Sequence, residues 1–371
     1  MRTAAARVGD PVAAVDTPAL VIDLDAMERN LARMAQFARE RGLRLRPHAK
    51  MHKCAAIAAL QMRAGAVGVC VQKLGEAEAL AEQGIADIFI SNEIVDPAKL
   101  ARVAALAQRI TLAIAVDSAL GIDGLAAAMR ASGADIAVFV EIDVGQGRCG
   151  VAPAAAGALA QQVLAHGLRF AGLQAYHGKA QHLRSAAERE AAIHHAVTLA
   201  RTAQATITGA GIACPLVTGA GTGSFAFEAA SGVYGELQPG SYLFMDRDYA
   251  LNDPTPNAPS FEHALFVKSQ VMSRGHAHAV VDAGHKAHAI DSGLPAVWGR
   301  ELDFANGGDE HGILRARRDA ALPALGETVW LVPGHCDPTV NLHDHYVALR
   351  GGLARGTVEA VWPIDARGCL A

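Results

Sequence analysis

Long apolar runs are missing from this sequence of 371 residues. No stretch reaches the roughly 20 consecutive apolar residues that a membrane-spanning helix needs. Residues 1–16 contain Arg7, Asp10 and Pro11, so they also lack the continuous apolar core of a signal peptide. From these absences we expect a cytoplasmic protein that does not act at a membrane.

An excess of one charge and paired cysteines are also missing. The formal net charge is −4 at pH 7, and no block of like charges occurs. Nucleic acids and anionic membrane surfaces attract strongly basic proteins, so neither is an expected partner, and a small molecule is the expected ligand. The six cysteines are scattered without a C-x-x-C motif, which is typical of a reducing compartment and argues against a cysteine-based zinc site.

The sequence does contain a regular alternation of short apolar runs and Ala- and Leu-rich segments, such as "DPAKLARVAALAQ", between residues 17 and 249. The expected strands are Leu43–His48, Ala66–Val71, Asp87–Ile90, Thr111–Val116, Ala137–Ile142, Phe170–Ala175, Leu216–Thr218 and Ser241–Phe244. Strands separated by helices pair in parallel through right-handed crossovers, and eight such units predict an α/β fold, a closed (β/α)8 TIM barrel. A doubly wound open sheet is the alternative, because periodicity does not show closure.

The pattern changes after Tyr249. The segment "ALNDPTPNAPS" (250–260) is rich in Pro and Asn, as linkers often are. The runs beyond it, such as "ETVWLVPG", are rich in residues that favour strands and lack a long helical pattern. We therefore expect the barrel over residues 17–249 and a mostly antiparallel β domain over 250–371, with residues 1–16 packed against the β domain.

The stretch "LRLRPHAKMHKC" (43–54) places Arg44, Arg46, His48 and Lys50 on one side of an extended chain. Lys50 comes just after the first expected strand, and catalytic groups of a barrel sit at the carboxyl ends of its strands. Neighbouring cations disfavour the ammonium form, so we expect a lowered pKa and a nucleophilic amine that can form a Schiff base. The alternative is an ordinary solvated strand end.

Three later loops add candidate groups at the same rim. The seventh strand leads into "TGAGTGSF" (218–225), whose glycines allow backbone N–H groups to converge on a phosphate, although such a loop can also be a plain turn. The fifth strand is followed by Arg148, and the sixth by Tyr176, His177 and His182. Aromatic, basic and titratable groups are thereby expected on one rim.

Taken together, "TPALVIDLDAMERNL", "RPHAKMHK", "EIDVGQGRCGV", "YHGKAQH", "TGAGTGSF", "ELQPGSYLFMD" and "PGHCDPTVNLHD" resemble the D-threonine aldolase and D-serine dehydratase family. These are pyridoxal-phosphate enzymes with an alanine-racemase-like barrel followed by a β domain. The resemblance implies that Lys50 carries the cofactor and that Arg148 lies near its phenolic oxygen. It implies that Gln72 and Tyr176 line the cofactor ring. It also implies a phosphate site made by Thr218, Gly219, Gly221, Thr222 and Gly223.

The motif "PGHCDPTVNLHD" bears on the choice within this family. His335 and Asp337 are two residues apart, so on an extended chain they share one face and can share a divalent cation. Aldolases of the family resemble His-x-Asp here, whereas the dehydratases resemble His-x-Cys with zinc, and only Asp337 has that spacing. An imidazole with a carboxylate suits Mn²⁺, Mg²⁺ or Co²⁺ better than Zn²⁺. The alternative is that His335 merely ends a strand.

The resemblance implies metal-dependent cleavage of a D-β-hydroxy-α-amino acid, with D-threonine giving glycine and acetaldehyde as the model reaction. His182, at the position of the family's candidate base, would accept the hydroxyl proton. The alternatives are a dehydratase of the D-serine or D-3-hydroxyaspartate type and a non-catalytic protein that binds pyridoxal phosphate. Relatives pair, so a homodimer is expected.

Overall fold

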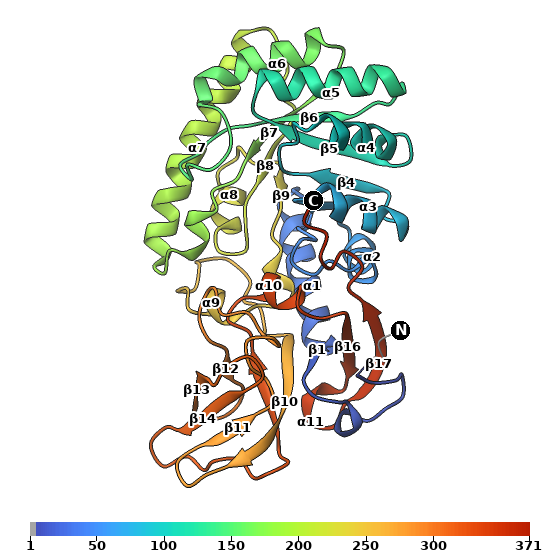
Figure 1. Ribbon diagram of the computed structural model, residues 1–371. Helices are drawn as coiled ribbons and strands as arrows, with labels where there is room; N and C mark the ends of the chain where they lie inside the picture. Colours follow the sequence, from blue (N-terminus) through green and yellow to red (C-terminus); the bar gives the residue numbers. More distant parts are fainter. Residues whose placement is uncertain (1–4) are drawn as a thin grey trace.

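The computed structural model describes residues 5–371, and its larger part is an eight-stranded parallel sheet that curls into a barrel with helices around it (Figure 1). The strand order is β2-β9-β8-β7-β6-β5-β4-β3. At the remaining seam, a parallel bridge joins His48 to Cys70. The sheet therefore curls round instead of lying open, which confirms the predicted barrel-type α/β fold. Its strands are β2 (Arg44–Leu45), β3 (Val69–Val71), β4 (Asp87–Ile90), β5 (Thr111–Val116), β6 (Ala137–Glu141), β7 (Arg169–Ala175), β8 (Val217–Gly219) and β9 (Glu236–Leu237).

Helices follow the barrel strands, and several begin at residues whose side chains satisfy the free N–H groups of the first turn. Asp23, Asp96, Ser118 and Ser185 each accept a hydrogen bond from a backbone N–H of the helix that follows. The helices of this part are α1 (Leu24–Glu40), α2 (Ala55–Arg63), α3 (Leu74–Glu82), α4 (Pro97–Ala107), α5 (Ala119–Ser132), α6 (Ala156–Ala165), α7 (Ala186–Gly209), α8 (Phe225–Ala230) and α9 (Arg247–Ala250).

Three of the expected strands differ from the structure by more than one residue, and one of them, Ala66–Val71, is a strand only at Val69–Val71. The run Leu43–His48 is a regular strand only at Arg44–Leu45. The run Ser241–Phe244 begins with the 3-10 helix η4 (Ser241–Leu243), and the eighth strand is instead the short β9. The apolar side chains that suggested a strand there are buried in the core shared with α1 and the β domain. Their burial comes from packing between the two parts of the molecule, not from a place in the sheet.

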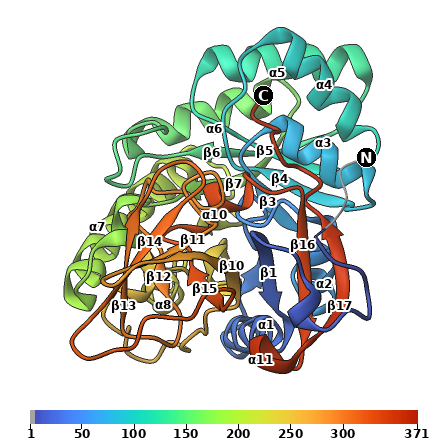
Figure 2. The same cartoon turned by 60° about the horizontal axis from the view of Figure 1, so that its bottom comes forward.

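The second part is a nine-stranded, mostly antiparallel sheet with the path β13-β14-β11-β10-β1-β16-β17, and β15 pairs with β10 and β12. Figure 2 shows β12–β14 on one side of it and β16–β17 on the other. Two short helices, α10 (Cys336–Val340) and α11 (Gly352–Arg355), belong to the same region. The strands are β1 (Ala19–Asp23), β10 (Leu265–Arg274), β11 (Ala279–Val281), β12 (Ala296–Val297), β13 (Leu302–Asn306), β14 (Gly312–Ala316), β15 (Thr328–Val332), β16 (His345–Arg350) and β17 (Thr357–Pro363).

Strand β1 lies in this second sheet although it falls inside the segment expected to form the barrel, 17–249. It pairs antiparallel with β10 and parallel with β16. Upstream of it, Val12 and Val15 pack with Val347 and Val358 of the same sheet. The sheet therefore places the boundary between the two parts after β1 and not at residue 17.

The barrel interior has an apolar side and a polar side. Phe89 and Phe139 stack with ring centroids 4.7 Å apart, whereas Arg46 lies with its guanidinium 3.2 Å from Glu236 and 2.5 Å from Asp87. Arg44 also pairs with Glu236. The two arginines in the row of basic residues are therefore neutralised by carboxylates of the barrel. Burying a charge is costly unless it is paired in this way.

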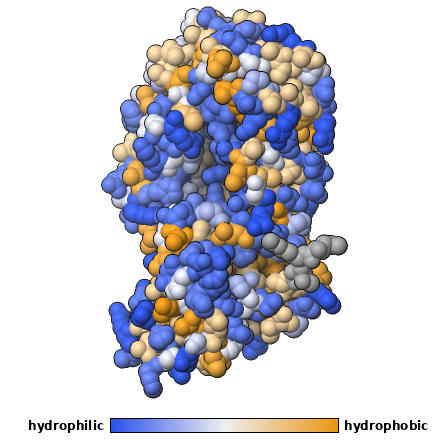
Figure 3. Space-filling model, viewed as in Figure 1, coloured by the Kyte–Doolittle hydropathy of each residue, from blue (hydrophilic) through white to orange (hydrophobic). Residues whose placement is uncertain are grey.

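On the outer surface, hydrophilic and hydrophobic residues are interspersed over the face seen in Figure 3. Among residues 5–371, none of the helices combines the length and apolar character that crossing a membrane requires.

Candidate active site

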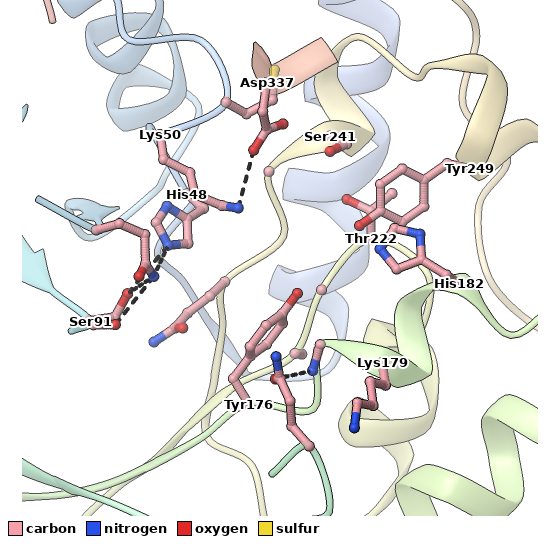
Figure 4. Close-up of a pocket in the computed structure, with 18 of the residues that line it drawn as sticks. His48, Lys50, Ser91, Tyr176, Lys179, His182, Thr222, Ser241, Tyr249 and Asp337 are labelled. Atoms are coloured by element: carbon pink, nitrogen blue, oxygen red, sulfur yellow. Dashed lines mark hydrogen bonds and ion pairs between the residues drawn. The ribbon is translucent and has the colours of Figure 1, made fainter. Parts of the chain in front are cut away.

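A cavity of about 410 Å³ opens at the carboxyl ends of the barrel strands, where the β domain meets the barrel (Figure 4). It gathers side chains from loops that follow most of the barrel strands and from the segment around α10. The predicted residues that line it are Lys50, Gln72, Arg148, Tyr176, His182, Gly221, Thr222, His335 and Asp337. The residues singled out in the sequence therefore make up much of the wall of this cavity.

Lys50 projects from the loop after β2, with its side chain 42% exposed, and Nζ lies 3.1 Å from Oδ2 of Asp337. The negative charge of Asp337 outweighs burial and raises the pKa of Lys50. The lowered pKa that the basic sequence around Lys50 predicted is therefore wrong, for two reasons. The arginines upstream are paired with carboxylates, and no local pattern indicated that Asp337 would come so close.

His335 and Asp337 do converge, although they are not on an extended segment as expected. His335 is the residue before α10, and Asp337 is in its first turn. His335 Nε2 lies 3.6 Å from Asp337 Oδ1, while His335 Nδ1 lies 2.9 Å from Oδ2 of Asp291. Cys336, between them, is fully buried and directs Sγ towards the carbonyl of Met245.

Oδ1 of Asp337 is buried and has no hydrogen-bond partner within the described part of the chain. A buried carboxylate oxygen without a partner is costly, and a cation between this oxygen and the imidazole of His335 would satisfy it. Over residues 5–371, no cluster of three or more His, Cys, Asp or Glu side chains suited to a metal is found. The pair therefore fits a cation whose other ligands are water or substrate.

His182 lies in the 3-10 helix η3 (Lys179–His182) after β7, beside Tyr249, with the two ring centroids 5.5 Å apart (Figure 4). Its Nδ1 lies 2.5 Å from Oδ2 of Asp248. His177, which the sequence also placed on this rim, is buried instead beside Gly145.

The glycine-rich loop divides into residues that face the cavity and residues that lie behind it. Gly221 and Thr222 face it, together with Ala220. Thr218 lies behind, where its hydroxyl donates to Glu236 at 2.9 Å, and Gly219 ends β8. The N–H of Gly223 donates to Oε1 of Gln181. A Cβ at Gly221 would lie 2.4 Å from that same oxygen, which explains why glycine fits there.

Arg148 and Tyr176 form one wall, with the guanidinium carbon 5.7 Å from the centre of the tyrosine ring. Burial raises the pKa of Tyr176, so its hydroxyl stays protonated. Gln72 also lines the cavity, and its side-chain nitrogen is 3.1 Å from Nε2 of His48 and 3.2 Å from the hydroxyl of Ser91. Burial holds the pKa of His48 well below its usual value, so this imidazole is neutral.

Several lining residues were missed from the sequence. Gln174 and Gln238 exchange side-chain hydrogen bonds at 3.2 and 2.9 Å on the barrel side of the cavity. Gln238 follows β9, whose two residues carry no period, and although it lies in the motif "ELQPGSYLFMD" no role was assigned to it. A signal did exist for Gln174, because it lies two residues before Tyr176 in an expected strand. The other missed residues with polar side chains are Ser91, Gln146, Lys179, Ser241 and Tyr249, whereas His48 belongs to the basic row noted in the sequence.

Comparison with known families gives two matches that together span most of the chain. Residues 22–248 match the alanine racemase N-terminal domain, and residues 264–349 match the putative serine dehydratase domain. Among curated proteins, the chain is 47% identical to a D-threonine aldolase of Arthrobacter sp over 98% of this chain and 96% of that one. It is 44% identical to a 3-hydroxy-D-aspartate aldolase of Paracoccus denitrificans (strain Pd 1222), over 95% and 92%.

Solved structures give the same picture. The D-threonine aldolase of Filomicrobium marinum superposes with a TM-score of 0.96 at 51% identity, and both chains are covered completely. The D-threo-3-hydroxyaspartate dehydratase of Delftia sp. HT23 superposes with a TM-score of 0.83 at 30% identity, over 95% of this chain and 98% of that one.

Proposed function

Because this chain belongs to the alanine racemase N-terminal domain family, in which its full-length relatives include D-threonine aldolase, we propose that it is a lyase. It cleaves D-β-hydroxy-α-amino acids between Cα and Cβ, and D-threonine gives glycine and acetaldehyde. The observation that carries this proposal is the meeting of Lys50 with Asp337 and His335 in one cavity. An amine that binds a carbonyl cofactor thereby lies next to a pair that fits a cation.

We propose pyridoxal phosphate as the cofactor, held by the amine of Lys50. The cavity suits it, because Gly221 and Thr222 offer backbone to a phosphate at one end and Arg148 offers a cation near the ring. Gln72 and Tyr176 would flank the ring, while Thr218, Gly219 and Gly223 would shape the phosphate loop from behind. When bound, this cofactor takes up the electron pair that the broken Cα–Cβ bond leaves on Cα.

The metal is the second proposed component. His335 Nε2 and Asp337 Oδ1 would hold a divalent cation of the Mn²⁺, Mg²⁺ or Co²⁺ type, with Zn²⁺ less suited to this donor set. A cation at this place would bind the β-hydroxyl of the substrate and lower its pKa. Support comes from the unpartnered Oδ1 of Asp337 and from Cys336, whose sulfur is turned away into the core.

Side chains of the protein then transfer the protons of the reaction. His182 lines the cavity and accepts the proton of the β-hydroxyl, and the electron pair of that O–H bond becomes the second bond of the aldehyde carbonyl. The Cα–Cβ bond breaks and the aldehyde leaves. A proton delivered to Cα then completes glycine. Tyr176, whose hydroxyl stays protonated, forms a wall of the same cavity.

Product analysis tests the proposal. The purified protein, supplied with pyridoxal phosphate and Mn²⁺, is incubated with D-threonine, and glycine and acetaldehyde are measured. L-threonine serves as the matched control and should give neither product. A keto acid with ammonia in place of these products would contradict the proposal.

That second outcome would identify a dehydratase, which is the alternative function. Its specific support is the similarity to D-threo-3-hydroxyaspartate dehydratase over both parts of the chain. The same cavity could eliminate the β-hydroxyl from D-3-hydroxyaspartate or D-serine if Lys50 removed the α-proton. D-3-hydroxyaspartate should therefore be included in the product analysis. We also propose a homodimer in the cytoplasm, which sedimentation and fractionation would test.

A further inference from the structure

We infer that Asp248 is a positioning residue for the cleavage reaction, because its carboxylate accepts the Nδ1–H of His182 and leaves Nε2 as the proton acceptor in the cavity. The inference rests on the proposed function, in which His182 takes the hydroxyl proton. It assigns a role to a residue that lies outside the cavity wall and that no motif in the sequence pointed to.

The contact between these two side chains is short and shielded. His182 Nδ1 and Asp248 Oδ2 are 2.5 Å apart, and the side chain of Asp248 is only 9% exposed, whereas that of His182 is 48% exposed. The imidazole thus has one edge on a buried carboxylate and the other towards the cavity it lines. Within residues 5–371, Nε2 of His182 has no hydrogen-bond partner, so it is available to a substrate.

Asp248 is itself held in place by several contacts. Its Oδ1 accepts from Nη2 of Arg184, and its backbone carbonyl accepts from Nη1 of the same arginine at 2.6 Å. Arg184 Nη1 also donates to Asn252 at 2.7 Å. Burial alone would raise the pKa of Asp248, but the hydrogen bonds from Arg184 and His182 outweigh it and keep that pKa below its usual value. The carboxylate is therefore ionised.

An ionised carboxylate can only accept hydrogen bonds, so the proton between the two side chains must belong to Nδ1 of His182. In neutral imidazole, a proton on Nδ1 leaves a lone pair on Nε2, which is the form a general base needs. The negative charge of Asp248 also stabilises the imidazolium that forms when Nε2 takes the proton. Asp248 therefore determines both the tautomer and the orientation of the ring.

Helix α9, which contains Asp248, also contacts the segment that carries the proposed metal ligands His335 and Asp337. The N–H of Asp248 donates to the carbonyl of Gly334 at 3.2 Å, and Oδ2 of Asp246 accepts from the N–H of Cys336 at 3.0 Å. Asp248 in helix α9 thus contacts Gly334, the residue before His335. Asp246, the residue before this helix, contacts Cys336, which lies between His335 and Asp337. Through these contacts, the proton acceptor and the proposed metal ligands are placed relative to one another.

The effect of replacing Asp248 with asparagine can be predicted because Arg184 determines how the introduced amide is oriented. The guanidinium can only donate, so it holds the amide oxygen of the introduced side chain towards itself and turns the NH₂ group towards His182. That group would donate to Nδ1, and the imidazole proton would move to Nε2. Asp248→Asn should therefore stabilise the wrong tautomer, whereas Asp248→Ala leaves both tautomers accessible.

The test compares the wild-type holoenzyme with D248N, D248A and D123N. Asp123 pairs with His166 at 2.9 Å on the outside of the barrel, so D123N makes the same chemical change at a His–Asp pair far from the cavity. We expect D248N to lower kcat for D-threonine cleavage on the order of 10²-fold or more. D248A should lower kcat less than D248N does, and D123N should leave it unchanged. KM and the absorbance of the bound cofactor should stay near the wild-type values in all three.

Imidazole ¹⁵N shifts provide a readout that does not depend on turnover, with the His182 signals assigned by their loss in H182Q. We expect His182 to be protonated on Nδ1 in the wild type and on Nε2 in D248N. Wild-type kcat in D248N, or an Nε2–H tautomer in the wild type, would overturn the inference. A wild-type enzyme that yields no glycine from D-threonine would instead count against the proposed function, and the tautomer would still be measurable.

Discussion

The amine of Lys50 in the barrel lies 3.1 Å from the carboxylate of Asp337 in the β domain. This ion pair joins the two parts of the molecule at the point where the reaction is proposed to occur. It also places the proposed cofactor residue and the proposed metal residue within one contact of each other. Loss of Lys50 should therefore affect cofactor binding, whereas loss of Asp337 should affect metal binding in the same site.

For the cofactor, we predict that Lys50→Ala removes the visible absorbance of the bound pyridoxal phosphate, because the imine that gives this absorbance can no longer form. The matched control is Lys179→Ala, since Lys179 also lines the cavity. That variant should keep the absorbance. Borohydride reduction followed by peptide mapping gives the direct answer, and a reduced cofactor on Lys53 or Lys179 would contradict the assignment of Lys50.

For the metal, we predict that a strong chelator abolishes D-threonine cleavage and that Mn²⁺ restores it. His335→Ala and Asp337→Ala should lose activity even in excess Mn²⁺. Cys336→Ala is the informative control, because the sulfur of Cys336 is buried away from the pair and its loss should leave the metal requirement intact. Turnover that survives complete metal removal would show that His335 and Asp337 do not act through a cation.

Asp291 should affect the metal without touching it. Its carboxylate lies 2.9 Å from Nδ1 of His335 and orients the ring so that Nε2 faces Asp337. We predict that Asp291→Ala weakens Mn²⁺ affinity about 10–100-fold, and that higher Mn²⁺ rescues activity. Asp309→Ala is the matched control, since Asp309 pairs with His285 at 2.7 Å on the exposed surface of the β domain. Equal losses in both variants would make the effect one of general stability.

Glu228 gives a prediction about stability and pH. It is buried in α8, accepts a hydrogen bond from Ser224 at 2.7 Å, and burial raises its pKa from 4.5 to about 7. Between these values the folded state keeps a proton that the unfolded state releases, so stability falls as pH rises through this window. The lost contribution is on the order of 3 kcal/mol.

The variant Glu228→Gln stays neutral at every pH and keeps the acceptor for Ser224. Relative to wild type, we expect it to gain stability as pH rises from 4.5 to 7, with little difference below 4.5. Urea unfolding of both proteins at a series of pH values measures this difference directly. A difference that stays constant across the series would mean that the carboxyl is already ionised in the folded protein.

The sequence predicted the barrel well where the strands are apolar and long enough to carry a period. Asp87–Ile90 and Thr111–Val116 agree with β4 and β5 at both ends. Strand β9 was missed because it has two residues, and one of them, Glu236, is a charged residue whose burial depends on its partners Arg44, Arg46 and Thr218. A buried ion pair between residues 190 positions apart leaves no pattern that a local reading can detect.

The candidate site likewise divides into residues that a local sequence pattern revealed and residues that it did not. Groups named by short motifs, such as Lys50, His335 and Asp337, were found, because each motif keeps its members close along the chain. Asp248 and Asp291 were not found, because their partners lie 66 and 44 residues away. The error in the pKa of Lys50 has the same origin, since the carboxylate that determines it comes from the other part of the molecule.

Strand β1 fixes the N-terminal part of the described chain into the sheet that the C-terminal part forms. Because β1 sits between β10 and β16, the barrel is an insertion within the β sheet, and the chain leaves that sheet at Asp23 and re-enters it at Leu265. The chain therefore crosses between the β sheet and the barrel twice, and both crossings restrain how the two parts lie against each other. A fragment that ends near residue 250 would leave β1 without either neighbour, and it would also lack Asp337, the carboxylate that faces the amine of Lys50.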